Sequence, residues 1–235
     1  MDLSAFAITR RWPPRTPGAI QLYSLPTPNG IKVGVMLEEC GLPYDAHRVS
    51  FDRQDQMTPE FLSLNPNNKI PAIIDPEGPD GRPMGLWESG AILVYLADKT
   101  GRFLPSGGAA RYGTLQWLMF QMGGLGPMFG QFGFFHKFAG REIDDPRPRT
   151  RYADEARRLL RVVEGQLDTR DWLTGDYSIA DMAVAPWLGT MRDGYKGGEV
   201  VGWADFPRIE AYLNRFNARP AVQAGRKAAA EDWAG

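Results

Sequence analysis

Cysteine and histidine are scarce in this sequence, and their scarcity removes whole classes of site. The 235 residues include one cysteine, Cys40, and two histidines, His47 and His136. A single cysteine excludes an internal disulfide framework and a CxxC redox centre, which fits a reducing compartment. Two histidines far apart in the sequence argue against a histidine-based metal site. We therefore expect no metal and a cytoplasmic location.

The sequence also lacks net charge and long hydrophobic runs. Its 27 Lys and Arg residues nearly balance 28 Asp and Glu residues, giving a net charge of -1. This balance provides no electrostatic attraction to nucleic acid or to an anionic membrane. No apolar run approaches the roughly 20 residues of a membrane span. With 43% hydrophobic residues, the composition is that of a globular protein with one large domain or two small ones.

The most informative stretch runs from residue 65 to residue 90. An Asn68-Lys69-Ile70-Pro71 loop precedes a short apolar run, a turn rich in glycine and proline, and a second apolar run. Glu88-Ser89-Gly90 then opens a helix with apolar residues at helical spacing. This order predicts a hairpin followed by a helix whose first amides and positive dipole end face the Ile70-Pro71 loop.

The same stretch has the chemistry of a receptor for a peptide-like zwitterion. A cis Pro71 would leave the backbone of Ile70 available to another extended chain. Ser89 and the helix amides can hold a carboxylate, and Glu88 can hold an ammonium group. Taken separately, Pro71 is also explained as the end of a loop and Ser89 as a helix cap.

The first 104 residues indicate an arm followed by a mixed α/β domain. Residues 1–19 are basic, rich in proline and without periodicity, and the paired arginines in them do not lead into the apolar segment of a secretion signal. A strand over 20–24, a helix ending near Cys40 and a strand over 44–49 predict a parallel βαβ unit. A short helix over 59–64 follows. We expect the α/β domain to span residues 20–104.

Strand signals disappear after this point, and residues 107–235 are predicted to form an all-helical domain. Helices are expected over 111–121, from about 150 to 167, from Ser178 onward, over 206–217 and from 220. The spacing of Ser178 and Asp181 is that of a capping box. A glycine run over 123–130 lacks the Gly-Lys-Ser/Thr ending of a phosphate loop, which argues against nucleotide binding.

Together these motifs resemble a glutathione transferase over residues 20–224. The Asn68–Pro71 and Glu88–Ile92 motifs resemble the glutathione-binding half of that family, and Ser178-Ile179-Ala180-Asp181 resembles the helical half. Thr27-Pro28-Asn29-Gly30 and residues 115–128 are similar to the Nu class, whose members are glutathione-dependent disulfide reductases. The resemblance implies a thioredoxin-like α/β N-terminal domain, an all-α C-terminal domain and a homodimer.

The resemblance also assigns roles to individual residues. The Ile70 backbone, before Pro71, would pair with the cysteinyl part of glutathione, and Thr27 and Asn29 would lie beside its sulfur. Pairs of side chains would hold the two ends: Glu88 and Ser89 the γ-glutamyl group, Gln56 and Lys69 the glycyl carboxylate. Nu-class proteins hold two glutathiones per site, and Arg151 resembles a contact to the second, with Arg149 as the alternative in the helix register.

Thr27 stands where a thioredoxin-like redox enzyme needs its cysteine. Cys40 completes the apolar stripe of the first helix about three turns farther on, so we expect it to be buried and inert. The reactive thiolate would then be that of glutathione, stabilised by the helix dipole, Thr27 and Asn29. Turn and cap chemistry is the alternative for both residues. Tyr23 is a rival sulfur ligand, but strand alternation places it on the opposite face from Leu22.

Three functions remain open on this evidence. The first is glutathione-dependent reduction of a small-molecule or protein disulfide, with bound glutathione thiolate as the nucleophile. The second is conventional transfer of glutathione to an electrophile, or peroxidase activity. The third is binding of glutathione or a partner without turnover.

Overall fold

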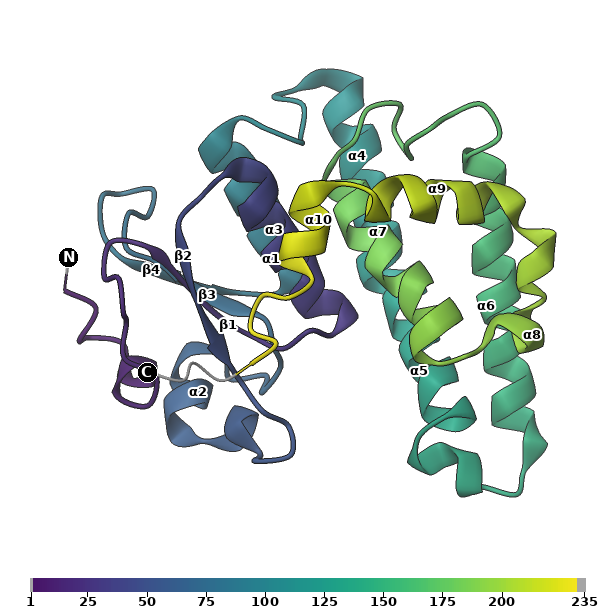
Figure 1. Cartoon of the computed structure of the whole chain (residues 1–235), viewed down its shortest axis with the longest axis horizontal. Helices are drawn as coiled ribbons and strands as arrows, with labels where there is room; N and C mark the ends of the chain where they lie inside the picture. The colour runs from purple at the N-terminus through teal and green to yellow at the C-terminus, as the bar shows by residue number, and fades with distance from the viewer. Residues whose placement is uncertain (1, 232–235) are drawn as a thin grey trace. The chain divides into compact units, whose positions relative to one another are not determined.

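The computed structural model describes residues 2–231 and divides into two compact units, of which unit 1 contains the chain up to Arg102 and the segment from Pro220 on. Figure 1 shows its elements. In chain order they are η1 (Ala7–Arg10), β1 (Ile20–Ser24), α1 (Pro28–Cys40), β2 (Tyr44–Arg48), η2 (Asp55–Met57), α2 (Pro59–Leu64), β3 (Ala72–Asp75), β4 (Met84–Trp87), α3 (Ser89–Thr100) and α10 (Pro220–Gly225).

Four strands form a mixed sheet in the order β2-β1-β3-β4. The strands β1 and β2 are parallel and are connected through α1, whereas β3 runs antiparallel to both β1 and β4. This topology confirms the predicted βαβ unit, the hairpin and the thioredoxin-like fold class. The register aligns one row of residues across the sheet: Trp87, Ala72, Tyr23 and His47.

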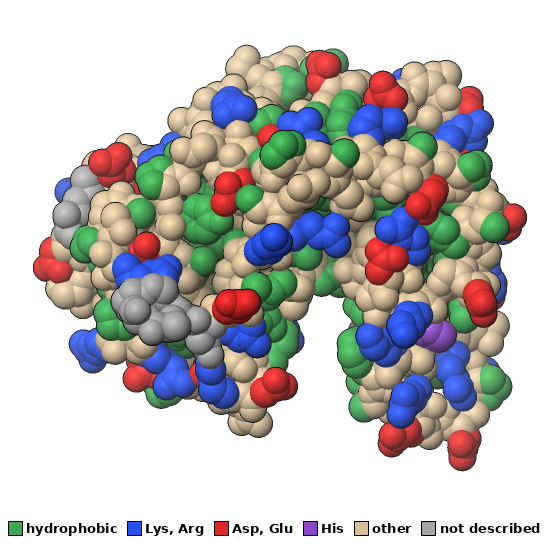
Figure 2. Space-filling view, viewed as in Figure 1, with side chains coloured by type: hydrophobic (Ala, Val, Ile, Leu, Met, Phe, Trp, Pro, Cys, Tyr) green, Lys and Arg blue, Asp and Glu red, His purple; other side chains and the backbone are tan. Residues whose placement is uncertain are grey.

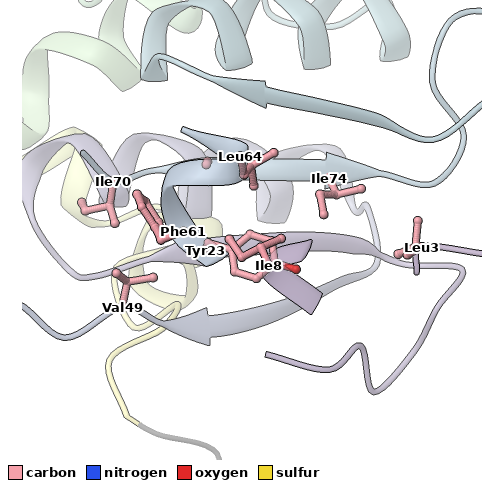
Figure 3. Close-up of a cluster of buried hydrophobic side chains, with 9 residues drawn as sticks. Leu3, Ile8, Tyr23, Val49, Phe61, Leu64, Ile70 and Ile74 are labelled. Atoms are coloured by element: carbon pink, nitrogen blue, oxygen red, sulfur yellow. The ribbon is translucent and has the colours of Figure 1, made fainter. Parts of the chain in front are cut away.

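The helix α1 begins and ends where local chemistry favours it. Thr27 is the N-cap, Pro28 occupies the first helical position, and Gly41 ends the helix with a left-handed conformation at φ 66°. In Figure 1, α1 and α3 lie on one face of the sheet and α2 lies on the other. The cluster of buried side chains on the α2 face includes Tyr23, and Figure 3 shows this cluster.

The N-terminal segment differs from the predicted arm, because it contributes to this core. Leu3 and Ile8 are buried in the same cluster as Tyr23, and Trp12 packs against it. The segment is also held by polar contacts, since the backbone N–H groups of Arg15 and Thr16 both donate to the Asp45 carboxylate. The buried positions of these residues could not be predicted from the sequence, because they lie in separate turns and their spacing follows neither a helix nor a strand period.

Unit 2 spans Phe103–Arg219, and its assigned elements are all helices, apart from an isolated β-bridge between Thr174 and Asp176. Its elements are α4 (Gly108–Phe120), the π-helical turn η3 (Gln121–Leu125), α5 (Gly126–His136), η4 (Ala139–Glu142), α6 (Pro146–Gln166), α7 (Ile179–Gly189), the π-helical turn η5 (Thr190–Gly194), α8 (Gly198–Val201), η6 (Trp203–Asp205) and α9 (Pro207–Asn217). The predicted all-α class of this domain is confirmed.

The helix α7 is buried at the centre of unit 2. Residues 179–188 are all buried. The capping box at its start is formed, with the Ser178 N–H donating to the Asp181 carboxylate at 2.9 Å. Asp181 also accepts from the Leu173 N–H and from the Tyr212 hydroxyl, at 3.0 and 3.1 Å. Burial nevertheless raises the pKa of Asp181 to about 6.

Two boundaries differ from the expected ones. The range 107–235 assigned the last helix to the helical domain, but α10 packs against α1 within unit 1, where the backbones approach closely at Gly34 and Gly225. The helix α6 begins at Pro146 rather than near residue 150, because Asp145 caps it and Pro146 fills the first position. Among residues 2–231, no helix is long and apolar enough to span a membrane.

Candidate functional site

The register of the sheet brings four of the predicted site segments to one end of unit 1. The aligned row lies at the end of β1, the end of β2, the start of β3 and the end of β4. Four loop segments therefore join the sheet at this end. Three of them follow a strand and carry Thr27, Gln56 and Glu88, and the fourth leads into β3 and carries Ile70. The row is about 14 Å wide, because neighbouring strands lie roughly 4.8 Å apart.

Thr27 and Asn29 lie at the start of α1, and both side chains are half-buried. The Thr27 hydroxyl oxygen accepts from the Gly30 N–H at 3.3 Å, so its own hydrogen can still be donated. Gly30 is required here, because a Cβ at this position would lie 2.0 Å from the carbonyl oxygen of Leu25. The turn that precedes α1 therefore holds Thr27 in a fixed place with the helix N–H groups behind it.

The loop before β3 carries Lys69, Ile70 and Pro71. The Ile70–Pro71 peptide bond is cis, and Ile70 precedes β3 and takes no part in the strand ladder. Asn65, which is almost fully buried, donates from Nδ2 to the Lys69 carbonyl at 2.5 Å and accepts from the Asn67 N–H at 2.9 Å. Ile70 and Pro71 are buried, whereas Lys69 is exposed. Asn65 thus fixes the backbone of the loop and leaves the Lys69 side chain in solvent.

Glu88 and Ser89 open α3. Glu88 is exposed and adopts a φ of 72°, which is unusual for a residue with a side chain. Ser89 is 3% exposed, and its hydroxyl oxygen lies 3.1 Å from the ammonium nitrogen of Lys32. Lys32 extends from α1 and is completely buried. Burial lowers the pKa of Lys32 to about 7, against the opposing effect of the Glu88 carboxylate.

Sequence reasoning missed Lys32, although a signal was present. Lys32 precedes Met36 by four residues, so it falls on the apolar stripe of α1 that also contains Val33. A lysine on a buried stripe is rare unless it has a partner. The partner here is Ser89, from a segment 57 residues farther along the chain.

Gln56 lies in η2, the short turn after β2. Its side-chain oxygen is buried and has no hydrogen-bond partner among the described residues. The preceding residue, Asp55, is 1% exposed and organises the loop, because it accepts from Arg11, Arg53 and the Ser50 N–H. Gln56 is therefore presented by a loop that is fixed through its neighbour.

Arg151 belongs to unit 2. It is exposed on α6 and lines a hollow of about 550 Å³ with Arg147, Arg158 and Glu155. Arg149 lines a different hollow of about 300 Å³, which His136 also lines, and its guanidinium donates to the Ile143 carbonyl at 2.9 Å. Figure 2 shows Lys and Arg side chains gathered on this part of unit 2.

Two other candidates for sulfur chemistry are unsuited by their positions. Tyr23 is completely buried, stacked on His47 at 4.8 Å, and burial raises the pKa of its phenol. Cys40 is the last residue of α1 and is half-buried rather than fully buried as expected. Burial raises the pKa of its thiol, and its sulfur lies 3.5 Å from the Thr100 hydroxyl. Within residues 2–231, no cluster of His, Cys, Asp and Glu could hold a metal ion.

Family models match both halves of the chain. Residues 27–99 match the model described as the glutathione S-transferase N-terminal domain, and residues 146–215 match that of the C-terminal domain. The disulfide-bond oxidoreductase YfcG of Escherichia coli is 44% identical over 205 residues, covering 86% of this chain and 92% of the relative. YghU, a second disulfide-bond oxidoreductase of E. coli, is 39% identical, and the alignment covers 88% of this chain and 74% of the YghU chain.

Solved structures match over nearly the whole chain. A glutathione transferase from Burkholderia graminis, solved with two glutathione molecules bound per subunit, superposes with a TM-score of 0.95 at 61% identity, covering 97% of this chain and 95% of the other. A glutathione transferase from Pseudomonas putida, with one glutathione disulfide bound per subunit, has a TM-score of 0.95 at 58% identity. The match covers 97% of this chain and 99% of the other. The chain therefore belongs to the glutathione S-transferase family of enzymes.

Proposed function

We propose that this enzyme reduces disulfide bonds with glutathione, and that the attacking sulfur belongs to glutathione rather than to the protein. The observation that carries the proposal is the position of Cys40. It ends the 13-residue helix that Thr27 caps, so about 20 Å of helix separates the two ends. Its raised thiol pKa leaves little thiolate at neutral pH. A thiolate at the Thr27 end has to come from a bound molecule.

Glutathione suits the end of the sheet where the four segments meet. An extended tripeptide is about 10 Å long, which fits a row about 14 Å wide. We infer that the Ile70 backbone, before Pro71, pairs with the cysteinyl residue, and that Glu88 and Ser89 bind the γ-glutamyl end. Gln56, with its unpartnered buried oxygen, and the exposed Lys69 are suited to the glycyl end. The glutathione-bound relatives support a glutathione site in this chain.

Thr27 and Asn29 would ionise the thiol. The Thr27 hydroxyl retains a hydrogen to donate, because its oxygen already accepts from the Gly30 N–H. The amide of Asn29 is a second donor, and the N-terminal end of α1 favours negative charge. These three effects lower the pKa of a thiol held there.

The reaction balances with two molecules of glutathione. The first thiolate attacks one sulfur of the disulfide, a mixed disulfide forms, and the other substrate sulfur leaves as a thiolate that takes up a proton. A second glutathione thiolate attacks the glutathione sulfur of the mixed disulfide, which releases the second substrate thiol and glutathione disulfide. The Nu-class assignment and a role for Arg151 in holding the second glutathione are part of this proposal. A relative with two glutathiones bound per subunit supports a second glutathione here.

The assembly and setting follow the same proposal. The reaction consumes reduced glutathione, which fits the cytoplasm. We infer a homodimer, because α4 exposes two large side chains on one face: Tyr112 is 73% exposed and Met119, two turns on, is 58% exposed. These two side chains are candidates for the contact with a second copy, which the family resemblance implies.

The proposal is tested by measuring reduction of hydroxyethyl disulfide in the presence of glutathione. We expect turnover by the wild-type enzyme and unchanged turnover by Cys40→Ala. Loss of all activity in Cys40→Ala, with the fold retained, would assign the chemistry to the protein thiol. Activity with an aryl halide but not with the disulfide would favour conventional transfer, and glutathione binding with neither reaction would favour a binding protein.

A further inference from the structure

One hollow of unit 2 is lined by none of the residues that the proposed function uses. Its volume is about 300 Å³, and α5, α6 and α8 contribute its lining, which includes His136, Arg149, Thr150, Asp154, Arg157 and Val200. A volume of this size is at the lower limit of small-molecule sites. The hollow that Arg151 lines shares only Thr150 and Asp154 with it. Residues two apart on a helix do not face each other, so Arg149 and Arg151 belong to different hollows.

The charges around this hollow favour an anion. Its carboxylate, Asp154, is already paired with the Arg157 guanidinium at 2.5 Å. Arg149 donates to backbone carbonyls instead, those of Arg141 and Ile143. Within residues 2–231 it forms no ion pair with a carboxylate, so its charge is left for a ligand. A guanidinium carries five N–H donors, and these two bonds leave several of them unused.

Two further donors border the same space. The His136 ring stacks on Phe132, which is 2% exposed, with 4.8 Å between the ring centroids. Neither the His136 ring nitrogens nor the Thr150 hydroxyl forms a hydrogen bond with another residue of the described chain. Together with Arg149, they offer N–H and O–H groups from three side chains. A phosphate group has three oxygens that can accept from three such donors, whereas a carboxylate has two.

The rest of the lining is partly apolar. Val200 is 37% exposed, and Phe132 and Ala153 border the hollow as well. Inorganic phosphate would leave this apolar surface in contact with water. An apolar group attached to the phosphate would cover it, at about 25 cal/mol for each Å² removed from water.

We propose that this hollow binds a small phosphate monoester. The phosphate group meets Arg149, His136 and Thr150, and the apolar group of the ester lies against Val200. The site is one of binding, and it takes no part in disulfide reduction. An enzyme that fails to reduce disulfides can therefore still bind the ester, and the two proposals stand or fall separately.

Phenyl phosphate is the probe, and titration calorimetry with the full chain measures its affinity. We expect it to bind about fivefold more tightly than inorganic phosphate, which lacks the apolar group, and than benzoate, which lacks the third oxygen. Saturating glutathione should leave this affinity unchanged, because the glutathione site lies elsewhere in the chain. Displacement of phenyl phosphate by glutathione would overturn the proposal.

Substitutions test the donors one at a time. Arg149→Gln should weaken binding of phenyl phosphate about tenfold or more, the effect of losing a hydrogen bond to a charged group. His136→Phe keeps a ring on Phe132 but removes its N–H, and should weaken binding about fivefold. Val200→Ser should weaken binding of phenyl phosphate and leave that of inorganic phosphate unchanged. Thermal unfolding establishes that each variant folds; if Arg149→Gln does not, Arg149→Lys and His136→Phe decide.

The matched control is Arg161→Gln, which removes an exposed arginine of α6 that lines neither hollow and should leave the affinity unchanged. An equal loss in Arg161→Gln and Arg149→Gln would show attraction to the helix as a whole and overturn the site. Equal binding of benzoate would overturn the phosphate assignment. Equal binding of inorganic phosphate, with no effect of Val200→Ser, would overturn the ester, and absence of binding would overturn the whole proposal.

Discussion

The Arg11 guanidinium donates to the Asp55 carboxylate at 2.6 Å, which ties the N-terminal segment to the loop that carries Gln56. Asp55 is 1% exposed, and its other oxygen accepts from the Ser50 N–H at 2.8 Å. Burial alone would raise the pKa of this carboxyl group, but the hydrogen bonds from Arg11 and Ser50 and the charge of Arg53 lower it. The N-terminal segment therefore supports one side of the candidate site.

We predict that Arg11→Ala lowers the free energy of unfolding by about 1.5–3 kcal/mol, the contribution of a hydrogen bond to a charged group. Arg53 remains to compensate Asp55 in part, so the protein should still fold. Because Gln56 directly follows Asp55, the KM for glutathione should rise while kcat changes little. Urea unfolding and steady-state kinetics measure these effects. The control is Arg10→Ala, which removes an exposed arginine one position earlier; equal effects of the two variants would contradict the prediction.

The two roles of Thr27, capping α1 and donating to the glutathione sulfur, can be separated by substitution. Aspartate caps a helix about as well as threonine does, so Thr27→Asp should change the free energy of unfolding by less than about 0.5 kcal/mol. A carboxylate beside the sulfur raises the thiol pKa, and each unit of pKa leaves tenfold less thiolate. We expect disulfide reduction to fall at least tenfold in Thr27→Asp.

The thiolate of bound glutathione is measured by its ultraviolet absorbance as a function of pH. Thr27→Ser keeps both the cap and the hydroxyl, and it should retain most of the activity. Thr27→Ala loses both and should cost about 1 kcal/mol of stability. Wild-type turnover by Thr27→Asp would exclude Thr27 from the chemistry and leave it as a cap.

The parts of this structure that the sequence predicted are those with local causes. Thr58 and Pro59 begin α2 because a cap and a first-position proline act within one turn. The capping box at Ser178 is equally local. Strand alternation, which has a period of two residues, correctly separated Tyr23 from the face of Leu22. Each of these signals is complete within a few residues.

The features that sequence reasoning missed depend on contacts between distant segments. Lys32 meets Ser89 across 57 positions, and α10 packs against α1 across about 190. The position of Lys32 on the apolar stripe of α1 is a signal, but a lysine beside apolar residues usually extends its ammonium group to solvent, and the sequence does not identify a partner 57 residues away. The start of α6 differs from the expected one for another reason: proline is common both in loops and at the first position of a helix, and here Pro146 is the first helical residue.

His47 makes the stability of unit 1 sensitive to acid. It is 7% exposed, its Nε2 lies 2.8 Å from the Gln21 oxygen, and its ring stacks on Tyr23. Burial, with a smaller effect of Arg15, lowers its pKa to about 4. Between about pH 6.5 and pH 4 the unfolded chain therefore binds more protons at this residue than the folded chain, so stability falls as the pH falls.

We expect this residue to cost about 3 kcal/mol of stability between pH 7 and pH 4, since one pKa unit corresponds to about 1.4 kcal/mol. Other groups also titrate in this range, so the measurement is a comparison. Urea unfolding at several pH values should give a shallower loss for His47→Gln than for the wild type. An unchanged pH dependence in His47→Gln would show that the imidazole is protonated equally in both states.

The close packing of α10 on α1 predicts that Gly225→Ala destabilises the protein, whereas Gly165→Ala, in an open position on α6, stabilises it. A Cβ at Gly225 would lie 2.4 Å from the backbone nitrogen of Val35, and one at Gly34 would lie 2.4 Å from the carbonyl oxygen of Gly225. Backbone atoms cannot move aside as side chains do, so Gly225→Ala has to push the two helices apart. We expect it to lower the free energy of unfolding by about 1–3 kcal/mol.

Gly165 is the matched control, because it lies in the last turn of α6 with no atom within 4 Å of its would-be Cβ. Gly165→Ala should stabilise the protein by about 0.5–1 kcal/mol, the difference in helix propensity. Thermal unfolding of Gly225→Ala and Gly165→Ala measures the difference in stability. If the higher helix propensity of alanine were the only effect, both substitutions would stabilise the protein. A stabilising Gly225→Ala would therefore mean that α10 does not pack against α1 in solution, and that the last helix belongs outside unit 1.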